Sequence, residues 1–594
     1  MKSLLEENMA PAKLIASTIL AGFNRHYQLF RQKTATAKQL FEQENWGSIQ
    51  QLGAERIQMY DTRVQEALDA LHQYDLKALH DDTWMQTKRE YIALLVNHHQ
   101  PELAETFFNS VMTKLLDKSY YNNQYIFLKP ATSIEYIESE TSSFVSFYPT
   151  HQGLRGCIKK MLAHFEWEHP FVHLNKDIAN ILRAARQYLQ PQGEWPLFDL
   201  NLHIQILNAP FFRNKAAYLM GQIIHGSHRY PFALPIVFNH RHQLVIDAAI
   251  FDPKQISVLF SFARAYFLVE MEVPSAFVRF LKEMLPMRGL GDFYTLLGLH
   301  KQGKNIFWRE FQRHLEHSQD KFILAPGIKG QVMSVFTLPS FPYVFKVIKD
   351  VFSGNKTCTR EQVREKYLLV KKHDRVGRMA DTLEYSGVVL PKARCHTEML
   401  EEMRQFAPSQ IEEKDDMIII KHVYIEHRLQ PLNIFLQTAT PEAKKAALID
   451  YGYAIKELAS ANIFPGDLLY KNFGMTRFGR VIFYDYDEIE YMTDCQFRRI
   501  PPPPSFEAEM SDEIWYPVHD GDVFPEEFAF FLLGNEDTKQ VLMQYHADLF
   551  HPEFWQNKKE KILRKEIEDF FPYPQAVRFK PQTLADGITD LTDV

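Results

Sequence analysis

The spacing of apolar residues changes near residue 320, and this change limits how the chain can fold. Before it, apolar residues recur mainly at three- and four-residue steps, which is typical of helices that bury one face. After it, strand-like runs come first and charged helical segments follow, an order that predicts an α+β arrangement. The 594 residues also exceed what one hydrophobic core usually serves. We therefore predict an α+β chain with two domains, an all-helical domain over residues 1–320 and a mixed domain over residues 321–594.

In the first domain, two sets of apolar residues at helical spacing are Ile57, Tyr60, Val64, Leu68 and Leu71, and Phe277, Phe280, Leu281 and Met284. One segment departs from this pattern. Residues 232–251, FALPIVFNHRHQLVIDAAIF, contain two strand-like runs around a polar turn and predict a hairpin. His240 and His242 lie in that turn, where we expect solvated side chains rather than metal ligands.

In the second domain, residues 325–350 predict a hairpin, and a strand follows at 416–425. Charged residues at helical spacing predict one helix over 359–379 and another over 441–462.

Composition excludes several classes of protein. The net charge of -7 weighs against a dedicated nucleic-acid binder. No stretch approaches the roughly 18 apolar residues of a membrane span, and the N-terminus has acids where a signal peptide has bases. The cysteines form no CxxC pair, so we expect free thiols in a reducing cytoplasm. They are Cys157, Cys358, Cys395 and Cys495.

The segment APGIKGQVMSVFTLPSFPYVFKVIKD (325–350) contains a candidate phosphate-binding loop. Gly327 and Gly330 have no Cβ to keep the backbone away from a phosphate. No GK[ST] follows, so a Walker loop is excluded. A glycine loop followed by a strand, a turn and a strand bearing a lysine, here Lys346, is instead the order found in protein kinases. The lysine of a kinase usually pairs with a glutamate of the next helix, where Glu361 and Glu365 both qualify. The alternative is a plain hairpin whose lysine reaches solvent.

The segment NIFPGDLLYKNFG supplies the chemistry that such a loop would need. Asp467 and Asn472 match the D-x-x-x-x-N of a kinase catalytic loop, in which the aspartate accepts the substrate hydroxyl proton. Asp485 follows an apolar run in RVIFYDYDEIEY and offers the hard oxygen that Mg²⁺ requires, together with Asn472. Three elements in this order favour a nucleotide site over three unrelated surface features.

Two departures from the kinase pattern leave a choice open. Residues 465–466 are Pro-Gly where kinases have His-Arg, and residues 485–487 are Asp-Tyr-Asp where kinases have Asp-Phe-Gly. Asp485 or Asp487 could thus be the main metal ligand, and the spacing favours Asp485.

A third candidate is the segment YHADLFHPEFW, with His546, Asp548 and His551. It would suit a separate metal-dependent phosphatase centre. The spacing matches no established ligand pattern, so we expect helix-surface histidines here.

The motifs together resemble the bacterial isocitrate dehydrogenase kinase/phosphatase family, most densely over residues 325–530, in HDRVGRMADT, PLNIF, ANIFPGDLLYKNFG, VIFYDYDEI and DGDVFPEEF. The resemblance implies a helical regulatory domain followed by a bilobal, protein-kinase-like catalytic domain. It also implies that the protein phosphorylates and dephosphorylates a serine of isocitrate dehydrogenase, thereby controlling the glyoxylate bypass. ATP, Mg²⁺ and allosteric AMP are the expected cofactors, and a homodimer is left open.

The same resemblance assigns individual residues. Lys346 contacts the phosphates, and Asp381 in GRMADT serves the phosphatase reaction, although without the family it would be an ordinary surface acid beside Arg375 and Arg378. The adenine is expected against the backbone of Val423, Tyr424 and Ile425. The nucleotide loop comprises Ala325, Pro326, Gly327, Ile328, Lys329, Gly330 and Gln331.

Two other functions compete with this hypothesis. One is a serine/threonine kinase with another substrate and no phosphatase activity, which would have no need of Asp381. The other is a non-catalytic nucleotide-sensing scaffold, which would tolerate the loss of Asp467 or Asn472.

Overall fold

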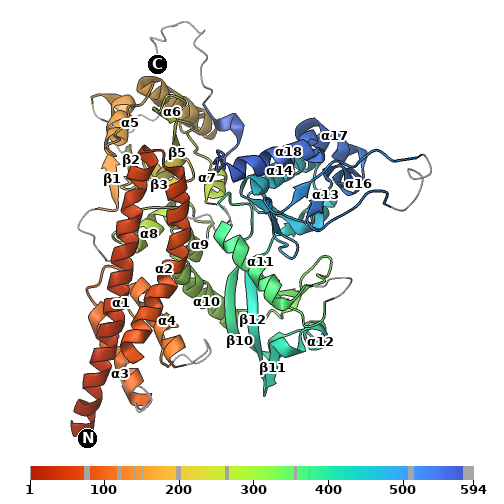
Figure 1. Cartoon of the computed structure of the whole chain (residues 1–594). Coiled ribbons are helices and arrows are strands. Elements are labelled where there is room, and N and C mark those ends of the chain that lie inside the picture. Colours follow the sequence, from red (N-terminus) through yellow and green to blue (C-terminus); the bar gives the residue numbers. More distant parts are fainter. Residues whose placement is uncertain are drawn as a thin grey trace.

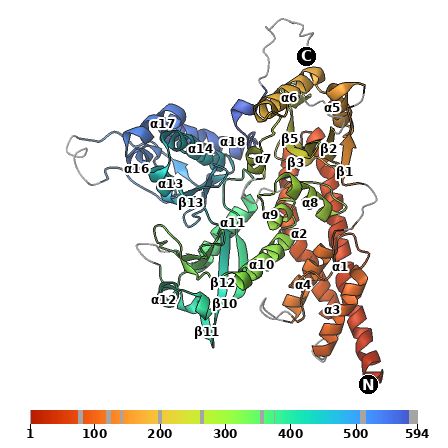
Figure 2. The ribbon, with the colours of Figure 1, turned by 180° about the vertical axis from the view of Figure 1, so that it is seen from behind.

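The computed structural model describes residues 2–72, 81–116, 124–135, 137, 142–149, 151–195, 202–260, 267–352, 358–373, 375–505 and 514–579. The first half of the chain forms a tall column, and the second half forms two bodies beside it, one above the other (Figure 1). The view from behind shows the same division (Figure 2). Within the described residues, no helix is long and apolar enough to cross a membrane.

Four helices form the end of the column that carries the N-terminus (Figure 1). They are α1 (Lys2–Glu42), α2 (Trp46–His72), α3 (Asp81–Leu95) and α4 (Pro101–Leu115). The stripe predicted within residues 57–71 lies on α2. The side chain of Ile57 lies outside the described part, and the other four members are buried, as predicted: Tyr60, Val64, Leu68 and Leu71.

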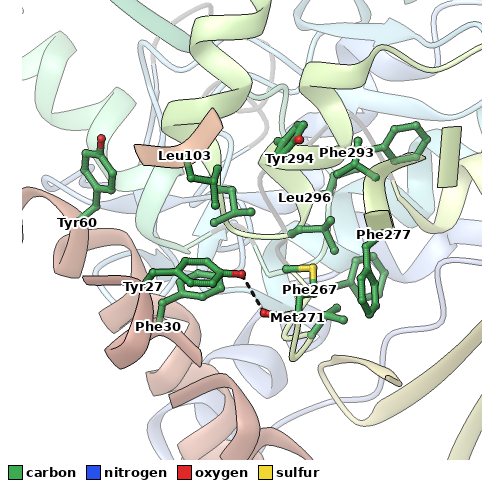
Figure 3. Packing of buried hydrophobic residues seen from close by; sticks show 14 of the residues in the cluster. Tyr27, Phe30, Tyr60, Leu103, Phe267, Met271, Phe277, Phe293, Tyr294 and Leu296 are labelled. Atoms are coloured by element: carbon green, nitrogen blue, oxygen red, sulfur yellow. Dashed lines mark hydrogen bonds between the residues drawn. The ribbon is translucent and has the colours of Figure 1, made fainter. Parts of the chain in front are cut away.

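Later helices complete this core. They are α7 (Pro253–Leu259), α8 (Pro274–Met284), α9 (Leu290–Leu296) and α10 (His300–His317). The predicted stripe on α8 is confirmed, since its four apolar residues are all buried. Figure 3 shows Tyr27 and Phe30 of α1 beside Phe267 and Met271, and the Tyr27 hydroxyl donates a hydrogen bond to the Met271 backbone oxygen at 2.9 Å.

The prediction that the first domain is all helical is wrong, because its upper part contains a six-stranded antiparallel sheet. The strand order is β1-β2-β4-β5-β6, and β3 pairs with β4. The strands are β1 (Phe144–Phe147), β2 (His203–Leu207), β3 (Phe211–Arg213), β4 (Ala216–His225), β5 (His228–Phe238) and β6 (Leu244–Ile246). Two helices, α5 (Gly153–Ala163) and α6 (Leu174–Leu189), lie at the same end of the column (Figure 1).

The strands β4 and β5 were not predicted as a pair because both are buried on both faces over most of their length. Such strands lack the alternation of polar and apolar residues that identifies a half-exposed strand. The predicted hairpin between residues 232 and 251 is confirmed, with Ile236 opposite Ile246. His240 and His242 in its turn are exposed, as expected, and His242 contacts Glu44.

A second six-stranded antiparallel sheet begins the second half. Its order is β10-β12-β9-β8-β7, with β11 paired to β12. The strands are β7 (Ile323–Leu324), β8 (Met333–Thr337), β9 (Tyr343–Ile348), β10 (Leu383–Pro391), β11 (Ile411–Lys414) and β12 (Met417–His427). The strands predicted within residues 325–350 and 416–425 are therefore confirmed.

The helices α11 (Arg360–His373) and α12 (Thr397–Phe406) accompany this sheet. The predicted helix over 359–379 is thus too long. Gly377 has φ of 78°, a left-handed conformation that interrupts a helix, and the chain continues in extended form to Asp381.

The second body is mixed as well. Its helices are α13 (Leu432–Thr438), α14 (Pro441–Ser460), α16 (Phe528–Leu532), α17 (Glu536–His546) and α18 (Pro552–Leu563). Its short strands are β13 (Gln430–Pro431), β14 (Ile463–Phe464), β15 (Phe473–Met475), β16 (Val481–Phe483), β17 (Glu490–Tyr491), β18 (Gln496–Phe497) and β19 (Asp522–Val523). The prediction of an α+β chain is confirmed.

The column and the second sheet share a core. Phe307, Trp308 and Phe311 of α10 pack with the buried residues of that sheet, and the Tyr385 hydroxyl of β10 donates to the Lys304 backbone oxygen at 2.7 Å. The helix α10 therefore fixes the sheet, and the site built on it, to the first half of the chain.

Candidate active site

The glycine loop lies between β7 and β8 and is exposed along residues 326–331. Gly327 has φ of 123°, which side-chain-bearing residues rarely adopt. A Cβ on Gly330 would lie 2.9 Å from the Met333 backbone oxygen. Both glycines are therefore required by the backbone path, and Pro326, Ile328 and Gln331 leave the loop open to solvent.

A buried ion pair supports this loop from below. Lys349, at the end of β9, donates to the Gly330 backbone oxygen at 2.8 Å and lies 3.4 Å from the Glu402 carboxylate of α12. Lys329, within the loop, reaches the other oxygen of Glu402 at 3.2 Å while its own side chain stays 71% exposed. The loop is thus tied at one end, and Lys329 presents a cation at its surface.

Lys346 lies on β9 with its side chain buried. Its Nζ is 2.7 Å from the Glu426 carboxylate and donates to the Tyr484 backbone oxygen at 2.9 Å. Neither Glu361 nor Glu365 supplies this pairing carboxylate. Glu426 comes instead from β12, where the register places its neighbour Tyr424 opposite Lys346.

The pKa of Glu426 is shifted by other acidic side chains nearby. Burial raises the pKa of its carboxyl group, and Lys346 lowers it. The negative charges of Asp485 and Asp381 raise the same pKa further. The Lys346–Glu426 pair therefore lies within electrostatic reach of two predicted site residues from distant parts of the chain.

The structure brings Asp467 and Asn472 together in one turn. The Asp467 Oδ1 accepts a hydrogen bond from the Leu469 backbone nitrogen at 2.8 Å, and the Asn472 amide donates to the Asp467 backbone oxygen at 3.2 Å. Lys471 Nζ lies 3.8 Å from the other Asp467 oxygen. Sequence reasoning missed Lys471, although a lysine so close to the predicted general base was a readable signal.

The Pro-Gly that replaces His-Arg before Asp467 has a structural reason. Gly466 has φ of 76°, and a Cβ there would lie 2.3 Å from the Glu488 backbone oxygen. The turn that carries Asp467 therefore packs directly on the segment after Asp487, and only glycine allows that approach.

Asn472 and Asp485 lie at the same end of the β15–β16 hairpin. Phe473 is opposite Phe483 in the register, and the Tyr484 nitrogen donates to the Asn472 backbone oxygen at 3.1 Å. Because Lys346 binds the Tyr484 oxygen, this hairpin end also lies beside β9. Lysine, asparagine and aspartate from three segments thus converge.

Asp487 faces a different neighbour. Tyr367 of α11 has its pKa raised by burial and then by the charges of Glu426, Asp487 and Asp485, which places Asp487 near α11. The charge of Asp485, but not that of Asp487, is among the causes that raise the pKa of Glu426. Of the two aspartates, Asp485 is the one whose charge is among the main causes that raise the pKa of both Glu426 and Tyr367.

Asp381 lies on an extended segment that runs along β16. Met379 bridges Phe483 in parallel, and the Ala380 nitrogen donates to the Phe483 oxygen at 3.0 Å. Arg378 does not pair with Asp381. It is buried and binds Asp450 and Glu457 of α14 instead, at 2.7 Å each.

The Asp381 side chain faces the first half of the chain. It lines a cavity of about 50 Å³ between α9, α10 and the second sheet, together with Arg288, Asp292, Tyr343 and His427. Asp381 is therefore half-buried and lines a cavity between the two halves, which differs from the interpretation of an ordinary surface acid paired with Arg375 and Arg378.

The predicted base-binding segment lies inside the sheet. Val423, Tyr424 and Ile425 are buried in β12, and Tyr424 and Ile425 have strand partners on both sides, in β10 and β9. Glu426 and His427 pair with β9 alone, and the chain leaves the sheet after His427, so residues 428–431 are the first backbone beyond the sheet.

The segment around His546 contains no metal centre. His546 is buried rather than on the helix surface, because it fills the space above Gly452, and its Nε2 bonds to the Ile449 backbone oxygen at 2.9 Å. Asp548 pairs with Lys456 at 2.6 Å. Across the described residues, no group of three or more His, Cys, Asp or Glu side chains could hold a metal by itself.

The donor set near Lys346 nevertheless suits Mg²⁺. This ion commonly takes one or two carboxylates from the protein and completes its shell with water and phosphate oxygens. Asp485 and Asn472 offer a carboxylate and an amide oxygen at one hairpin end. The site therefore fits a metal that arrives with nucleotide phosphates.

A glycine loop above a buried lysine, with Asp467, Asn472 and Asp485 in adjoining segments, is an arrangement typical of enzymes of phosphoryl transfer. Comparison with known proteins gives the particular family. Residues 16–319 match the model of the "Isocitrate dehydrogenase kinase/phosphatase (AceK), regulatory domain", and residues 320–575 match the model of its "kinase domain".

Known relatives agree with these models. Proteins named isocitrate dehydrogenase kinase/phosphatase from Aromatoleum aromaticum and Azoarcus sp. are 51% and 52% identical, each over 96% of both chains. A third, from Dechloromonas aromatica, is 50% identical over 98% of both chains. The chain therefore belongs to the isocitrate dehydrogenase kinase/phosphatase family.

Proposed function

We propose that this protein transfers phosphate from ATP to a serine of isocitrate dehydrogenase, which inactivates that enzyme, and removes the phosphate again. By doing so it would set the flux between the tricarboxylic acid cycle and the glyoxylate bypass. The observation that carries this proposal is the position of Lys346, Asp485 and Asp381 around the buried carboxylate of Glu426, with Asn472 at the hairpin end that Lys346 contacts through Tyr484. One nucleotide site would then serve both reactions.

The phosphorylation step follows from the positions of these groups. Asp467 accepts the serine hydroxyl proton as the serine oxygen attacks the terminal phosphorus of ATP, and the bond from that phosphorus to the ADP oxygen breaks. Lys346 and the loop 325–331 hold the phosphates, with Lys471 adding positive charge beside Asp467. Mg²⁺ held by Asn472 and Asp485, with Asp487 as a second candidate, would neutralise charge on the phosphates.

Phosphate removal would use the same pocket with water as the nucleophile. Asp381 accepts a proton from the water as its oxygen attacks the phosphoserine phosphorus, the bond from phosphorus to the serine oxygen breaks, and that oxygen regains a proton from solvent. The half-buried position of Asp381 in a cavity near Glu426 supports this role over that of a plain kinase with no phosphatase activity.

We further propose a bilobal, kinase-like arrangement for residues 321–594. The second sheet with α11 and α12 would be one lobe, and α13 to α18 the other. Residues 428–431, which link the two, would bind the adenine edge beside Val423, Tyr424 and Ile425. Residues 1–320 would be the regulatory domain, in which AMP acts as an allosteric effector. Limited proteolysis tests the boundary, and cleavage only within 330–490 would place it elsewhere.

The direct test is incubation of the protein with ATP, Mg²⁺ and purified isocitrate dehydrogenase, followed by intact mass of the substrate. We expect a mass gain of one phosphate and loss of dehydrogenase activity, both reversed when ATP is replaced by ADP. Repeating the reaction with AMP tests the allosteric proposal through the ratio of the two activities. An unmodified dehydrogenase would contradict the proposed substrate.

The four free thiols support a reducing cytoplasm as the site of action.

A further inference from the structure

The Asp-Tyr-Asp at 485–487 places a tyrosine where kinases have phenylalanine. The added hydroxyl group makes hydrogen bonds to the backbone. Tyr486 is fully buried. Its hydroxyl donates a 2.7 Å hydrogen bond to the Ala380 backbone oxygen and lies 3.3 Å from the Phe483 backbone oxygen. A phenylalanine at this position could make neither contact.

The Ala380 carbonyl belongs to the peptide that joins Ala380 to Asp381. Because a peptide unit is planar, a bond to its oxygen also fixes the nitrogen of Asp381 and the direction in which that residue leaves the strand. The Ala380 nitrogen is held separately by the Phe483 oxygen at 3.0 Å. Both peptide units that flank Ala380 are therefore anchored, the second of them by Tyr486.

The ring of Tyr486 has a different role from its hydroxyl. It packs edge-on against Tyr367 of α11, with ring centroids 5.1 Å apart, and against Phe483 at 5.7 Å. A phenylalanine ring would keep these contacts, and with them the path of the Asp485–Asp487 segment. The hydroxyl is the part that Tyr486→Phe would remove, and it bonds to the Asp381 segment at Ala380.

We propose that the Tyr486 hydroxyl positions Asp381 for phosphate removal and contributes little to phosphorylation. It would act as a positioning group, through Ala380, on a residue that touches the attacking water. This inference rests on the proposed phosphatase role of Asp381. It makes the segment that carries the metal-binding aspartates also the support of the phosphatase aspartate.

The test is Tyr486→Phe, which removes one oxygen atom and keeps the ring. We expect the kcat of phosphate release from phosphorylated isocitrate dehydrogenase to fall roughly 10- to 100-fold, with KM within about twofold, since a misplaced carboxylate affects the reaction more than binding. Kinase activity in the same preparation should stay above about half, because phenylalanine suffices in kinases. That activity also reports that the variant is folded.

The matched control is Tyr27→Phe, which removes another buried hydroxyl that binds a backbone oxygen, at Met271 in the first half. It should leave both activities near those of the unmodified protein. If it lowers phosphatase activity as much as Tyr486→Phe does, the effect is a general loss of stability and the proposal is wrong.

Two further variants, Asp381→Ala and the double variant Asp381→Ala/Tyr486→Phe, test the phosphatase role of Asp381 separately from the positioning role of Tyr486. If Asp381→Ala keeps phosphatase activity, the proposed function of Asp381 fails. If Asp381→Ala loses it but Tyr486→Phe does not, only the positioning proposal fails. Adding Tyr486→Phe to Asp381→Ala should cause no further loss, and a further loss would show that the hydroxyl acts by another route. Equal loss of kinase and phosphatase in Tyr486→Phe would also overturn the proposal.

Discussion

Two buried glutamates, one in each half of the chain, both have a raised pKa but differ in the groups beside them. Glu102 of α4 has the Tyr294 hydroxyl as its side-chain partner, at 3.2 Å, and burial raises its pKa to about 7. Glu426 of β12 is as deeply buried, yet it lies 2.7 Å from the ammonium group of Lys346 and near Asp485 and Asp381. Glu102 thus has an uncharged hydroxyl group as its partner, whereas Glu426 has a cation.

The difference between the two glutamates supports the proposal that the catalytic site lies in the second half of the chain. A buried carboxyl group that takes up a proton needs no ion beside it, and such burial is compatible with a purely structural role. A buried lysine is costly, because its charge loses water, and the pair around it gives little net stability. A buried lysine beside a cluster of acids therefore supports the proposal that Lys346 binds the negatively charged phosphates of a nucleotide.

The largest effect is expected from Lys346→Ala. It removes the positive charge that faces the nucleotide phosphates, so kinase activity should fall by at least about 10³-fold and ATP binding should weaken. Kinase assays and nucleotide titration measure both changes. Glu102→Gln, in the other half, is the matched control and should keep activity. A folded Lys346→Ala protein with full kinase activity would mean that the site is elsewhere.

Asp381→Ala should have the next largest effect, and this effect should fall on phosphate release and not on phosphorylation. Phosphate release should fall on the order of 10²-fold or more, because water lacks its proton acceptor, while most kinase activity remains. The matched control is Asp467→Ala, which should lower kinase activity by a similar factor. Parallel assays of both reactions decide the matter, and equal loss of both in Asp381→Ala would argue for a structural role.

A smaller, pH-dependent effect on stability is expected at Glu102. Its pKa rises from 4.5 to about 7 on folding, so its contribution to stability is fully present below pH 4.5 and is lost as the pH rises through 7. Relative to Glu102→Gln, the protein should therefore lose about 3 kcal/mol between these pH values. Thermal unfolding of both proteins from pH 4.5 to 8 measures this, and a difference that is constant with pH would contradict it.

The smallest effect is expected at Lys329, whose pairing with Glu402 is exposed on one side. Exposed ion pairs contribute at most about 1 kcal/mol, so Lys329→Ala should raise the KM for ATP by no more than roughly fivefold. Steady-state kinetics against ATP measures the change. A loss as large as that of Lys346→Ala would mean that exposure does not separate supporting cations from the essential one.

The sequence predicted the parts of the site that are local in the chain. Asp467 and Asn472 lie in one turn, and Asp485 follows the strand paired with that turn, so their spacing was sufficient. The partner of Lys346 could not be predicted, because Glu426 is brought there by the register of β12 on β9.

For the fold, too, features that are local in the chain could be predicted from the sequence, and long-range contacts could not. The stripes on α2 and α8 were readable because each helix has one exposed face. The strands β4 and β5 were not, because burial on both faces removes the alternation. His546 was predicted on a surface, but it fills the space left by Gly452, ninety-four positions earlier in the chain, and such a contact has no local signature.

The central claim is that one nucleotide site carries both reactions, and phosphate release from phosphorylated isocitrate dehydrogenase tests it most directly. The measurement compares the unmodified protein and Lys346→Ala, each with and without adenine nucleotide. We predict release only from the unmodified protein and only with nucleotide present, since Lys346 and the bound phosphates organise the charge around the phosphoserine. Release without nucleotide, undiminished by Lys346→Ala, would contradict the shared site and require a second centre in the chain.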